Sequence, residues 1–542
     1  MADTNLQETT AIILADEILD EYLEDLDIDN PPSPKEITTT VVNKIRKGIK
    51  ELNKDLPKTE RWSIPQSLDA HQIAKIMLRL YHVINVKAVS NGGTTSDPEM
   101  DMLAIYQTDG PDNGIYATND SAFRSVAKQY NSRLNKNSFA ELITDLQSEA
   151  PRKEQCSDKN LIPVNNGIFN YETKQLMFFD PEYVFITKSR TNYNPNATNV
   201  IIHNDADNTD WDVESWMNEL SDDKEIVNLL WEIIGASVRP YERWNKAAFL
   251  FSMQGNNGKG TLCQLIRNLC GTNNCVNIPL SDFSKDYALS EIIGKIAIIT
   301  DENDVNVYID KAANLKAIIT NDAVTLTRKY KSPISYQFFG FMIQCMNSYP
   351  KIKDKTNSFY RRQLFVPFTK CFTGQERSYI KNDYINRPEI LEYVLYRVLN
   401  MNYHKFSEPK ACRTALEDYK MANDPLRQFI DEIFPELVWD FVPFNFLYSL
   451  YKVWYKNNVG NLNMQGRNKF IQELVSILPE QDEWYCTDPN LKIRTGNKIN
   501  KPEPLIAEYN LTDWMNPNYK GSDINKICMP VLKPSYRGIL RY

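Results

Sequence analysis

Closely spaced cysteines and histidines are missing from this sequence. The nine cysteines are scattered without a CxxC pair, and only four histidines occur among 542 residues. Zinc sites and disulfide frameworks both need such residues at short spacings. We therefore expect neither a structural zinc site nor a disulfide framework, and we expect the cysteines to be buried, reduced thiols.

Long apolar runs and a secretory start are missing as well. Apolar runs such as 247–253 are too short to span a bilayer, and Met1 leads directly into an acidic segment instead of a signal peptide. These absences favour a cytoplasmic protein with no membrane partner. The length exceeds what one hydrophobic core supports, so we expect three or four domains.

Positive charge is absent from residues 1–30, which hold ten Asp and Glu and no Lys or Arg. The net charge of −8 would argue against a nucleic-acid partner, but without this segment the remaining chain carries +2. Residues 13–26 could form an amphipathic helix with its apolar side chains on one side. A mobile, solvated segment is the alternative. We favour a flexible acidic tail over residues 1–35 that docks on a partner and has no role in hydrolysis.

Helical and strand patterns alternate along the rest of the chain. Residues 36–205 mix both patterns, which predicts an α+β domain, and no catalytic constellation stands out in them. From 247 to 368, apolar strands alternate with helices, as is typical of a parallel sheet with crossover helices. Residues 426–542 begin with helical patterns and end in short strand-like pieces. Nine Lys and Arg stand against five Asp and Glu from Thr487 onward.

A glycine-rich loop joins the first of these strands to a helix. AAFLFSM has the composition of a buried strand, QGNNGKGT follows it, and LCQLIRNLC has helical spacing. Glycines allow backbone N–H groups to turn inward around a phosphate, and a helix N-terminus attracts an anion. Lys259 would neutralise the β- and γ-phosphates of ATP, and Thr261 would hold Mg²⁺. The residues expected to bind the nucleotide are Gly255, Asn256, Asn257, Gly258, Lys259, Gly260 and Thr261.

Two positions depart from the usual GxxxxGK[ST] pattern of a phosphate-binding loop. Met253 occupies the place of the first glycine, and Gly260 occupies the place of the hydroxyl residue, which moves the hydroxyl to Thr261. A chance glycine-rich turn is the alternative interpretation. The strand before the loop and the helix after it argue against chance.

Acidic and amide side chains follow the next apolar strands. The run IIGKIAIIT leads to Asp301 and Glu302, and the run FFGFMIQCM leads to Asn347. In a P-loop ATPase, residues at such strand ends hold Mg²⁺ and polarise the attacking water. We assign Asp301 to Mg²⁺, Glu302 to the water, and Asn347 to a place between these acids and the γ-phosphate. Ordinary turn residues are the alternative, so the assignment depends on the order of the motifs.

Two basic clusters belong to the same stretch of sequence. AVTLTRKYKSPISYQF predicts a hairpin with a basic, aromatic tip that could grip a phosphate backbone and stack on a base. The tip residues are Arg328, Lys329, Tyr330 and Lys331. Arg361 and Arg362 precede the last apolar strand, and arginines near a subunit boundary can reach a neighbour's γ-phosphate. A solvated turn and a surface ion pair are the respective alternatives.

The order of these motifs resembles that of the superfamily 3 AAA+ DNA helicases. GNNGKGT, IITDEND, the basic hairpin, the strand before Asn347 and DKTNSFYRRQLFVPF follow one another as in the phage, plasmid, genomic-island and poxvirus replication helicases. NLIPVNNGIFNYETKQLMFF and VPFNFLYSLYKVWYKNN resemble the segments that flank the ATPase in these proteins. The resemblance covers roughly residues 100–480.

This resemblance implies a fold with three parts. An α/β AAA+ P-loop ATPase core would cover residues 206–425, after a mixed α+β N-terminal domain over residues 36–205. A winged-helix-like basic domain would cover residues 426–542, and Arg467 and Lys469 in it could read origin duplex DNA. Many relatives carry a primase domain upstream, but its acidic motif is missing here. We therefore expect a helicase without primase.

The resemblance also implies a function. It indicates an ATP-dependent replicative DNA helicase of a phage or mobile genetic element, acting in a bacterial host cell as a homo-hexameric ring. Its partners would be single-stranded and forked DNA, and its cofactors ATP and Mg²⁺, bound between subunits. Lys259, Thr261, Asp301, Glu302 and Asn347 would act from one subunit. Arg361 or Arg362, together with Lys246, would act from the next.

Three function classes stay open on the sequence. The first is the replicative helicase, which could load itself at an origin. The second is a nucleotide-gated DNA-binding initiator or assembly switch that opens no duplex. The third is a small-molecule kinase with a GKGT loop, against which the basic hairpin and the paired arginines argue. DNA-stimulated ATP turnover would separate the kinase from the other two.

Overall fold

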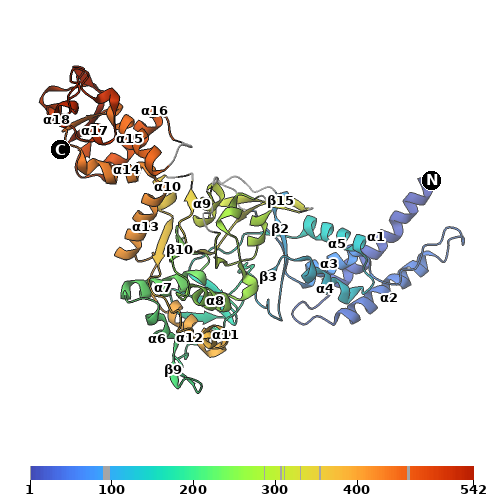
Figure 1. The fold of residues 1–542 in the computed structure, drawn as a ribbon. Coiled ribbons are helices and arrows are strands. Elements are labelled where there is room, and N and C mark those ends of the chain that lie inside the picture. Colours follow the sequence, from blue (N-terminus) through green and yellow to red (C-terminus); the bar gives the residue numbers. More distant parts are fainter. Residues whose placement is uncertain are drawn as a thin grey trace. The chain divides into compact units, whose positions relative to one another are not determined.

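Two compact units make up the chain, and Figure 1 shows the elements of both. The first unit comprises residues 1–354 and 361–412, and the second comprises residues 355–360 and 413–542. The computed structural model describes residues 2–88, 98–285, 287–304, 308–309, 312–329, 331–352, 354, 356–459 and 464–542. Among the helices described there, none is long and apolar enough to cross a membrane.

The N-terminal part of the first unit packs five helices against a four-stranded sheet. The helices are α1 (Ala2–Glu24), α2 (Pro34–Leu52), α3 (Ala70–Leu80), α4 (Asp120–Tyr130) and α5 (Lys136–Glu149). The strands are β1 (Val83–Val86), β2 (Met102–Tyr106), β3 (Tyr116–Ala117) and β4 (Arg152–Lys153), in the order β3-β2-β1-β4. Apolar residues of the helices and of β1, β2 and β3 share one core.

The acidic segment is a helix in this core, not the flexible tail that we favoured from the sequence. Leu19 and Leu23 of α1 are buried in one cluster with Ile45 of α2 and Ile73 of α3. Ala15, Leu19 and Leu23 recur every four residues, which places them on one face of the helix. The acidic residues occupy the other faces. The apolar stripe, and not the net charge, therefore decides that this segment folds.

A small β-rich segment connects this part to the central parallel-sheet core. It contains the antiparallel sheet of β5 (Leu161–Val164), β6 (Gly167–Asn170) and β7 (Gln175–Met177), and the hairpin of β8 (Ile202–Asn204) and β9 (Thr209–Trp211). Phe169 of β6 and Trp211 of β9 are buried in the same cluster as the helices of the parallel-sheet core. Phe169 and Trp211 therefore share that core, whereas Leu161 of β5 and Ile168 of β6 belong to a smaller, separate hydrophobic cluster.

The centre of the first unit is a five-stranded parallel sheet, as the alternating pattern predicts. Its strands are β10 (Ala247–Phe251), β11 (Cys275–Val276), β12 (Ala297–Thr300), β16 (Phe341–Met346) and β18 (Gln363–Pro367). The order is β11-β12-β16-β10-β18, and each neighbouring pair is parallel. The helices α6 (Val213–Glu219), α7 (Lys224–Ser237), α8 (Lys259–Cys270) and α12 (Pro388–Leu399) contribute to its core.

This strand order decides where polar residues meet. β10 lies between β16 and β18, and β12 lies on the other side of β16. Parallel strands all end at the same edge, so the residues that follow β10, β12 and β16 gather there. The α/β character of this core agrees with the sequence prediction.

The second unit has a separate core rich in tryptophan and phenylalanine. Its longer helices are α14 (Pro425–Ile433), α15 (Phe444–Asn458), α16 (Arg467–Ile477) and the end of α13 (Lys410–Asn423). Its strands are β19 (Phe441–Pro443), β20 (Trp484–Tyr485), β21 (Ile493–Arg494), β22 (Ser535–Tyr536) and β23 (Gly538–Arg541). They form the sheets β19-β23-β20 and β21-β22. This unit begins at Arg413, before the boundary expected at 426.

Candidate nucleotide-binding site

The glycine-rich loop turns tightly between β10 and α8. Asn256 has a φ of 51° and Gly258 has a φ of 85°, both in the left-handed region. A Cβ atom on Gly258 would also lie 2.5 Å from a methyl carbon of Leu220. Only glycine combines this backbone angle with this close approach. The loop conformation therefore depends on Gly258, whereas a Cβ on Gly255 would meet no atom within 4 Å.

Lys259 opens α8 and reaches across the carboxyl edge of the sheet. Its side chain is buried, and its Nζ donates to Asn347 Oδ1 at 2.9 Å and to the carbonyl of Met346 at 3.3 Å. Burial lowers the pKa of Lys259, while the charge of Glu302 is among the influences that raise it. No carboxylate of the described residues forms an ion pair with Lys259. A buried cation held only by neutral oxygens is suited to an incoming anion.

Asp301 and Glu302 follow β12, as the sequence predicts, but Asp301 has a partner that sequence reasoning missed. Arg267 of α8 binds both carboxylate oxygens of Asp301, at 2.9 and 2.8 Å, and also donates to the carbonyl of Ile299 at 3.0 Å. No hydrogen bond joins Asp301 to Thr261 in the described part of the chain. Both acids are exposed.

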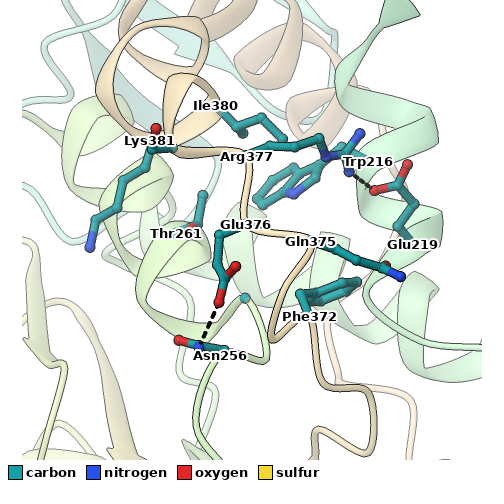
Figure 2. A pocket seen from close by; sticks show the side chains of 12 residues that line it. Trp216, Glu219, Asn256, Thr261, Phe372, Gln375, Glu376, Arg377, Ile380 and Lys381 are labelled. Carbon is teal, nitrogen blue, oxygen red and sulfur yellow. Dashed lines mark hydrogen bonds and ion pairs between the residues drawn. The ribbon is translucent and has the colours of Figure 1, made fainter. Parts of the chain in front are cut away.

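A pocket lies beside the glycine-rich loop, under the segment that follows β18 (Figure 2). The backbone N–H of Phe372 donates to the carbonyl of Asn256 at 2.7 Å, and the Asn256 amide donates to Glu376 at 3.0 Å. Thr261 lines this pocket, together with aromatic, charged and amide side chains. Those side chains include Trp216, Glu219, Phe372, Gln375, Glu376, Arg377 and Lys381.

Lys381, from helix α11 (Ser378–Asn382), brings a second cation to this pocket. A Cβ atom on Gly260 would lie 3.7 Å from the Nζ of Lys381, so this ammonium group stands over the first turn of α8. In Figure 2, Lys381 and Thr261 lie on the same side of the pocket. The sequence carries no signal for Lys381, because a lysine in a short helix is usually a solvated surface residue.

Arg361 and Arg362 lie at the edge of the sheet away from the glycine-rich loop. They precede β18, and the N–H of Ala247, the first residue of β10, donates to the carbonyl of Arg362 at 2.9 Å. The glycine-rich loop follows the other end of β10. A five-residue strand spans about 16 Å, so the structure separates these arginines from Lys259 of the same chain.

The basic hairpin consists of β14 (Ala323–Arg328) and β15 (Lys331–Gln337). The two strands are antiparallel, with Arg328 opposite Lys331 and a register shift between Leu326 and Arg328. Lys329 is exposed at the tip, and burial lowers the pKa of Arg328. Tyr330 and the side chain of Lys331, both predicted to contact DNA, lie outside the described residues.

Three family models match separate segments of the chain. Residues 44–222 match a model described as D5 N terminal like, and residues 421–516 match one described as poxvirus D5 protein-like. Residues 250–362, from β10 to Arg362, match a family of unknown function, DUF5906. Two of these matches therefore relate separate segments of the chain, one in each unit, to D5-type proteins.

Solved structures align with this chain only loosely. The A form apo structure of the NrS-1 C-terminal region is 13% identical, covers 88% of this chain and 99% of that chain, and gives a TM-score of 0.43. JCV helicase bound to a substituted acetamide is 14% identical, covers 44% of this chain and 63% of that chain, and gives a TM-score of 0.25.

Proposed function

We propose that this chain is an ATP-dependent replicative DNA helicase of a phage or mobile genetic element, which translocates on single-stranded DNA as a homo-hexameric ring. The contact between Lys259 and Asn347 carries the proposal, since it places a buried cation and a polar side chain where the strands of the sheet end. Asp301 and Glu302 follow the neighbouring strand. This is the arrangement that ATP hydrolysis needs around a γ-phosphate.

ATP would bind with its phosphates over the glycine-rich loop. Backbone N–H groups of residues 255–261 and the N-terminus of α8 would hold the phosphates, and Lys259 would neutralise them. The pocket beside the loop would take the nucleoside, with Phe372 as an apolar wall and Lys381 next to the phosphates. Thr261 lines this pocket, so its hydroxyl would face the nucleotide.

Mg²⁺ fits the residues of this edge only in part. Asp301 supplies a carboxylate of the type that Mg²⁺ prefers, but Arg267 already neutralises it. When bound with ATP, Mg²⁺ would neutralise charge on the phosphate oxygens. Asp301 and Thr261 would hold it, and Glu302 would orient and polarise the attacking water.

Hydrolysis would be completed by a second copy of the chain. Arg361 and Arg362 lie at the opposite edge of the sheet from Lys259, which makes them unsuited to their own site. In a ring, the same edge faces the neighbouring subunit's nucleotide, where an arginine stabilises the charge of the transition state. Lys246 lies at this edge too, in an ion pair with Glu408 at 2.8 Å.

The hairpin of β14 and β15 would couple hydrolysis to DNA movement. It leaves the core between β12 and β16, the two strands whose ends carry Asp301 and Asn347. Residues 301–322, which include α9 (Ala313–Ile319), connect the end of β12 to β14, so a shift at Asp301 on hydrolysis would reach the hairpin through this segment. Its basic tip would grip the phosphates of a single strand in the ring's pore.

The order of elements in the second unit supports its assignment as a winged-helix-like domain. The chain order α14, β19, α15, α16, β20 and β23, with β23 between β19 and β20, combines three helices with a small antiparallel sheet. The segment between β20 and β23 is long for a wing, since it holds β21, β22 and two short helices, α17 (Leu505–Glu508) and α18 (Ile524–Ile527).

The test compares strand separation and ATP turnover in matched variants. Lys259→Ala should abolish both activities. Lys329→Ala with Lys331→Ala should stop strand separation on a forked substrate while most ATPase activity remains. Lys54→Ala with Lys58→Ala is the control for loss of two exposed lysines, and it should leave both activities unchanged.

Three outcomes would overturn the proposal. Strand separation that persists in Lys259→Ala would remove the proposed site from the motor. A wild-type chain that hydrolyses ATP and binds DNA but never separates strands would instead support an ATP-gated origin initiator or assembly switch. ATP turnover that DNA does not stimulate would favour the small-molecule kinase.

A further inference from the structure

The second unit carries a two-stranded antiparallel ribbon, β21 and β22, between β20 and β23. Ile493 pairs with Tyr536, and Arg494 pairs with Ser535. Ile493 and Tyr536 pack against the hydrophobic core of the unit. The backbone N–H of Thr495 donates to the carbonyl of Pro534 at 3.2 Å, which continues the ladder by one step. One face of the ribbon is therefore fixed against the core.

The other face of the ribbon collects positive charge. Side chains alternate between the two faces of a strand, and directly opposed residues share a face. Because Ile493 and Tyr536 point to the core, Arg494 belongs to the outer face. The same alternation assigns Lys492, Lys533 and Arg537 to that face, with Lys492 and Arg537 opposite each other just beyond the ladder.

These four cations are poorly neutralised within the chain. Lys492, Arg494 and Lys533 are exposed. Within the part of the chain that the structure describes, no carboxylate forms an ion pair with any of the four. Arg537 donates to the side-chain oxygen of Asn490, at 3.4 Å. Like charges placed opposite each other destabilise a ribbon, so this face is arranged for an external anion.

The charges of the second unit are also segregated along the sequence. Residues 488–501 and 531–542, which contain the ribbon and its flanks, hold seven Lys and Arg against one Asp. Residues 413–487, which contain the larger helices, hold seven Lys and Arg against eleven Asp and Glu. A repeating anion would therefore be attracted to the ribbon and repelled by the helical part.

Helix α16, which we considered from the sequence as a reader of duplex DNA, does not show this arrangement. Lys469 lies 3.5 Å from Glu473 on the same helix, and Arg467 is only partly exposed. On the ribbon, about 25 residues further along the chain, Lys492, Arg494 and Lys533 are exposed and form no ion pair with a described carboxylate.

We propose that the outer face of β21 and β22 binds the phosphate backbone of double-stranded DNA through Lys492, Arg494, Lys533 and Arg537. A two-stranded ribbon fits against a duplex groove, and lysine and arginine are the side chains that contact phosphates. The contact is independent of the nucleotide site, because it lies in the second unit with its own core. It gives the chain a duplex anchor besides the hairpin that grips a single strand.

The test measures binding of the full chain to a blunt duplex without nucleotide, over a series of salt concentrations. The variant Lys492→Gln, Arg494→Gln, Lys533→Gln removes three exposed cations and keeps the packed face. The matched control, Lys452→Gln, Lys456→Gln, Lys469→Gln, removes three exposed lysines from the helices of the same unit. Basal ATP turnover should be unchanged in both variants.

We expect the ribbon variant to bind the duplex at least tenfold more weakly at low salt. The slope of log affinity against log salt should fall by about 0.9 for each phosphate that the variant no longer neutralises. The helix control should retain wild-type affinity and slope. Equally weakened binding in both variants, or unchanged duplex binding in the ribbon variant, would overturn the proposal. So would a defect confined to single-stranded DNA. A partial loss of duplex affinity in the single variant Arg494→Gln would show that the effect comes from the removal of a phosphate-binding cation and not from misfolding.

Discussion

The ammonium nitrogen of Lys259 lies 2.9 Å from the side-chain oxygen of Asn347. This contact joins the first turn of α8 to the end of β16, across a sequence separation of 88 residues. Asn347 is exposed, whereas Lys259 is buried. The asparagine therefore holds the lysine at the mouth of the site, where an incoming phosphate would displace or share the contact.

ATP affinity should fall more when a substitution of Asn347 adds negative charge than when it only shortens the side chain. In Asn347→Asp, the new carboxylate would pair with Lys259 and repel the γ-phosphate, so we expect ATP affinity to fall by more than tenfold. In Asn347→Ala, Lys259 keeps the carbonyl of Met346, and we expect ATP affinity within about threefold of wild type. Equilibrium binding of a fluorescent ATP analogue measures both. Equal affinity in the two variants would contradict the role assigned to this contact.

Substitutions of Asp301 and Glu302 should change different quantities, the Mg²⁺ dependence of ATPase activity and the turnover number respectively. Glu302→Gln should lower the turnover number by about 100-fold or more without changing the Mg²⁺ concentration at half-maximal rate, because it removes a general base. Asp301→Asn should raise that Mg²⁺ concentration severalfold. Mg²⁺ titrations of steady-state ATPase activity measure both effects. Interchanged results would assign the metal to Glu302 and the water to Asp301.

The strands of the central parallel sheet could be predicted from sequence because their signals are local. An apolar run, a glycine-rich loop and an amphipathic helix each occupy neighbouring residues, and Lys259 follows directly from that order. The meeting of Lys259 with Asn347 needed only one further rule, that parallel strands end at one edge. The positions of Lys259 and Asn347 thus follow from the hydrophobic periodicity and from the order of the elements along the chain.

The pocket beside the loop could not be predicted in this way. Trp216, Phe372 and Lys381 come from α6, from the segment after β18 and from α11, and each has an ordinary composition around it. The pairing of Arg267 with Asp301 was missed for a related reason, since it depends on the rotation of α8 against β12. Such contacts follow from packing between distant segments, and a single sequence carries no local signal for them.

The acidic N-terminal segment shows how composition can mislead. Ten acidic residues suggest a solvated tail, but folding depends on the stripe of Ala15, Leu19 and Leu23 on one face of α1. Acidic side chains on the remaining faces cost little, because they stay near water. Spacing was therefore the better guide than charge for this segment.

The separation of Arg361 and Arg362 from Lys259 within one chain leads to a mixing experiment. A variant with Arg361→Ala and Arg362→Ala should lose ATPase activity, and so should Lys259→Ala. In a mixed ring, some interfaces combine an intact Lys259 with intact arginines from the other variant. We therefore expect mixing to restore a fraction of wild-type ATPase activity. Steady-state assays over a range of mixing ratios measure this, and a mixture as inactive as its parts would place both roles in one subunit.

Lys188 gives the first unit a predictable response to pH. Its side chain is 1% exposed, and its Nζ donates to the carbonyls of Asn113 at 2.7 Å and Asn165 at 3.0 Å. Burial, reinforced by the charge of Arg190, lowers the pKa of Lys188 to about 8. In the unfolded chain the pKa of a lysine is about 10.4. Between these two values the unfolded chain binds more protons than the folded chain does.

The sign of the effect follows from this difference in protons bound. Below pH 8 both states are charged and the folded state carries the full cost of burying the ammonium group. As pH rises, the folded state loses the proton first, so the free energy of unfolding should increase by about 2 kcal/mol between pH 7.5 and 9.5. Lys188→Met has no titrating group there. Denaturant unfolding measures the free energy of unfolding of both proteins at the two pH values. From pH 7.5 to 9.5, this free energy should rise by about 2 kcal/mol more in the wild type than in Lys188→Met. A difference that does not change with pH would show that Lys188 is not desolvated in the folded chain.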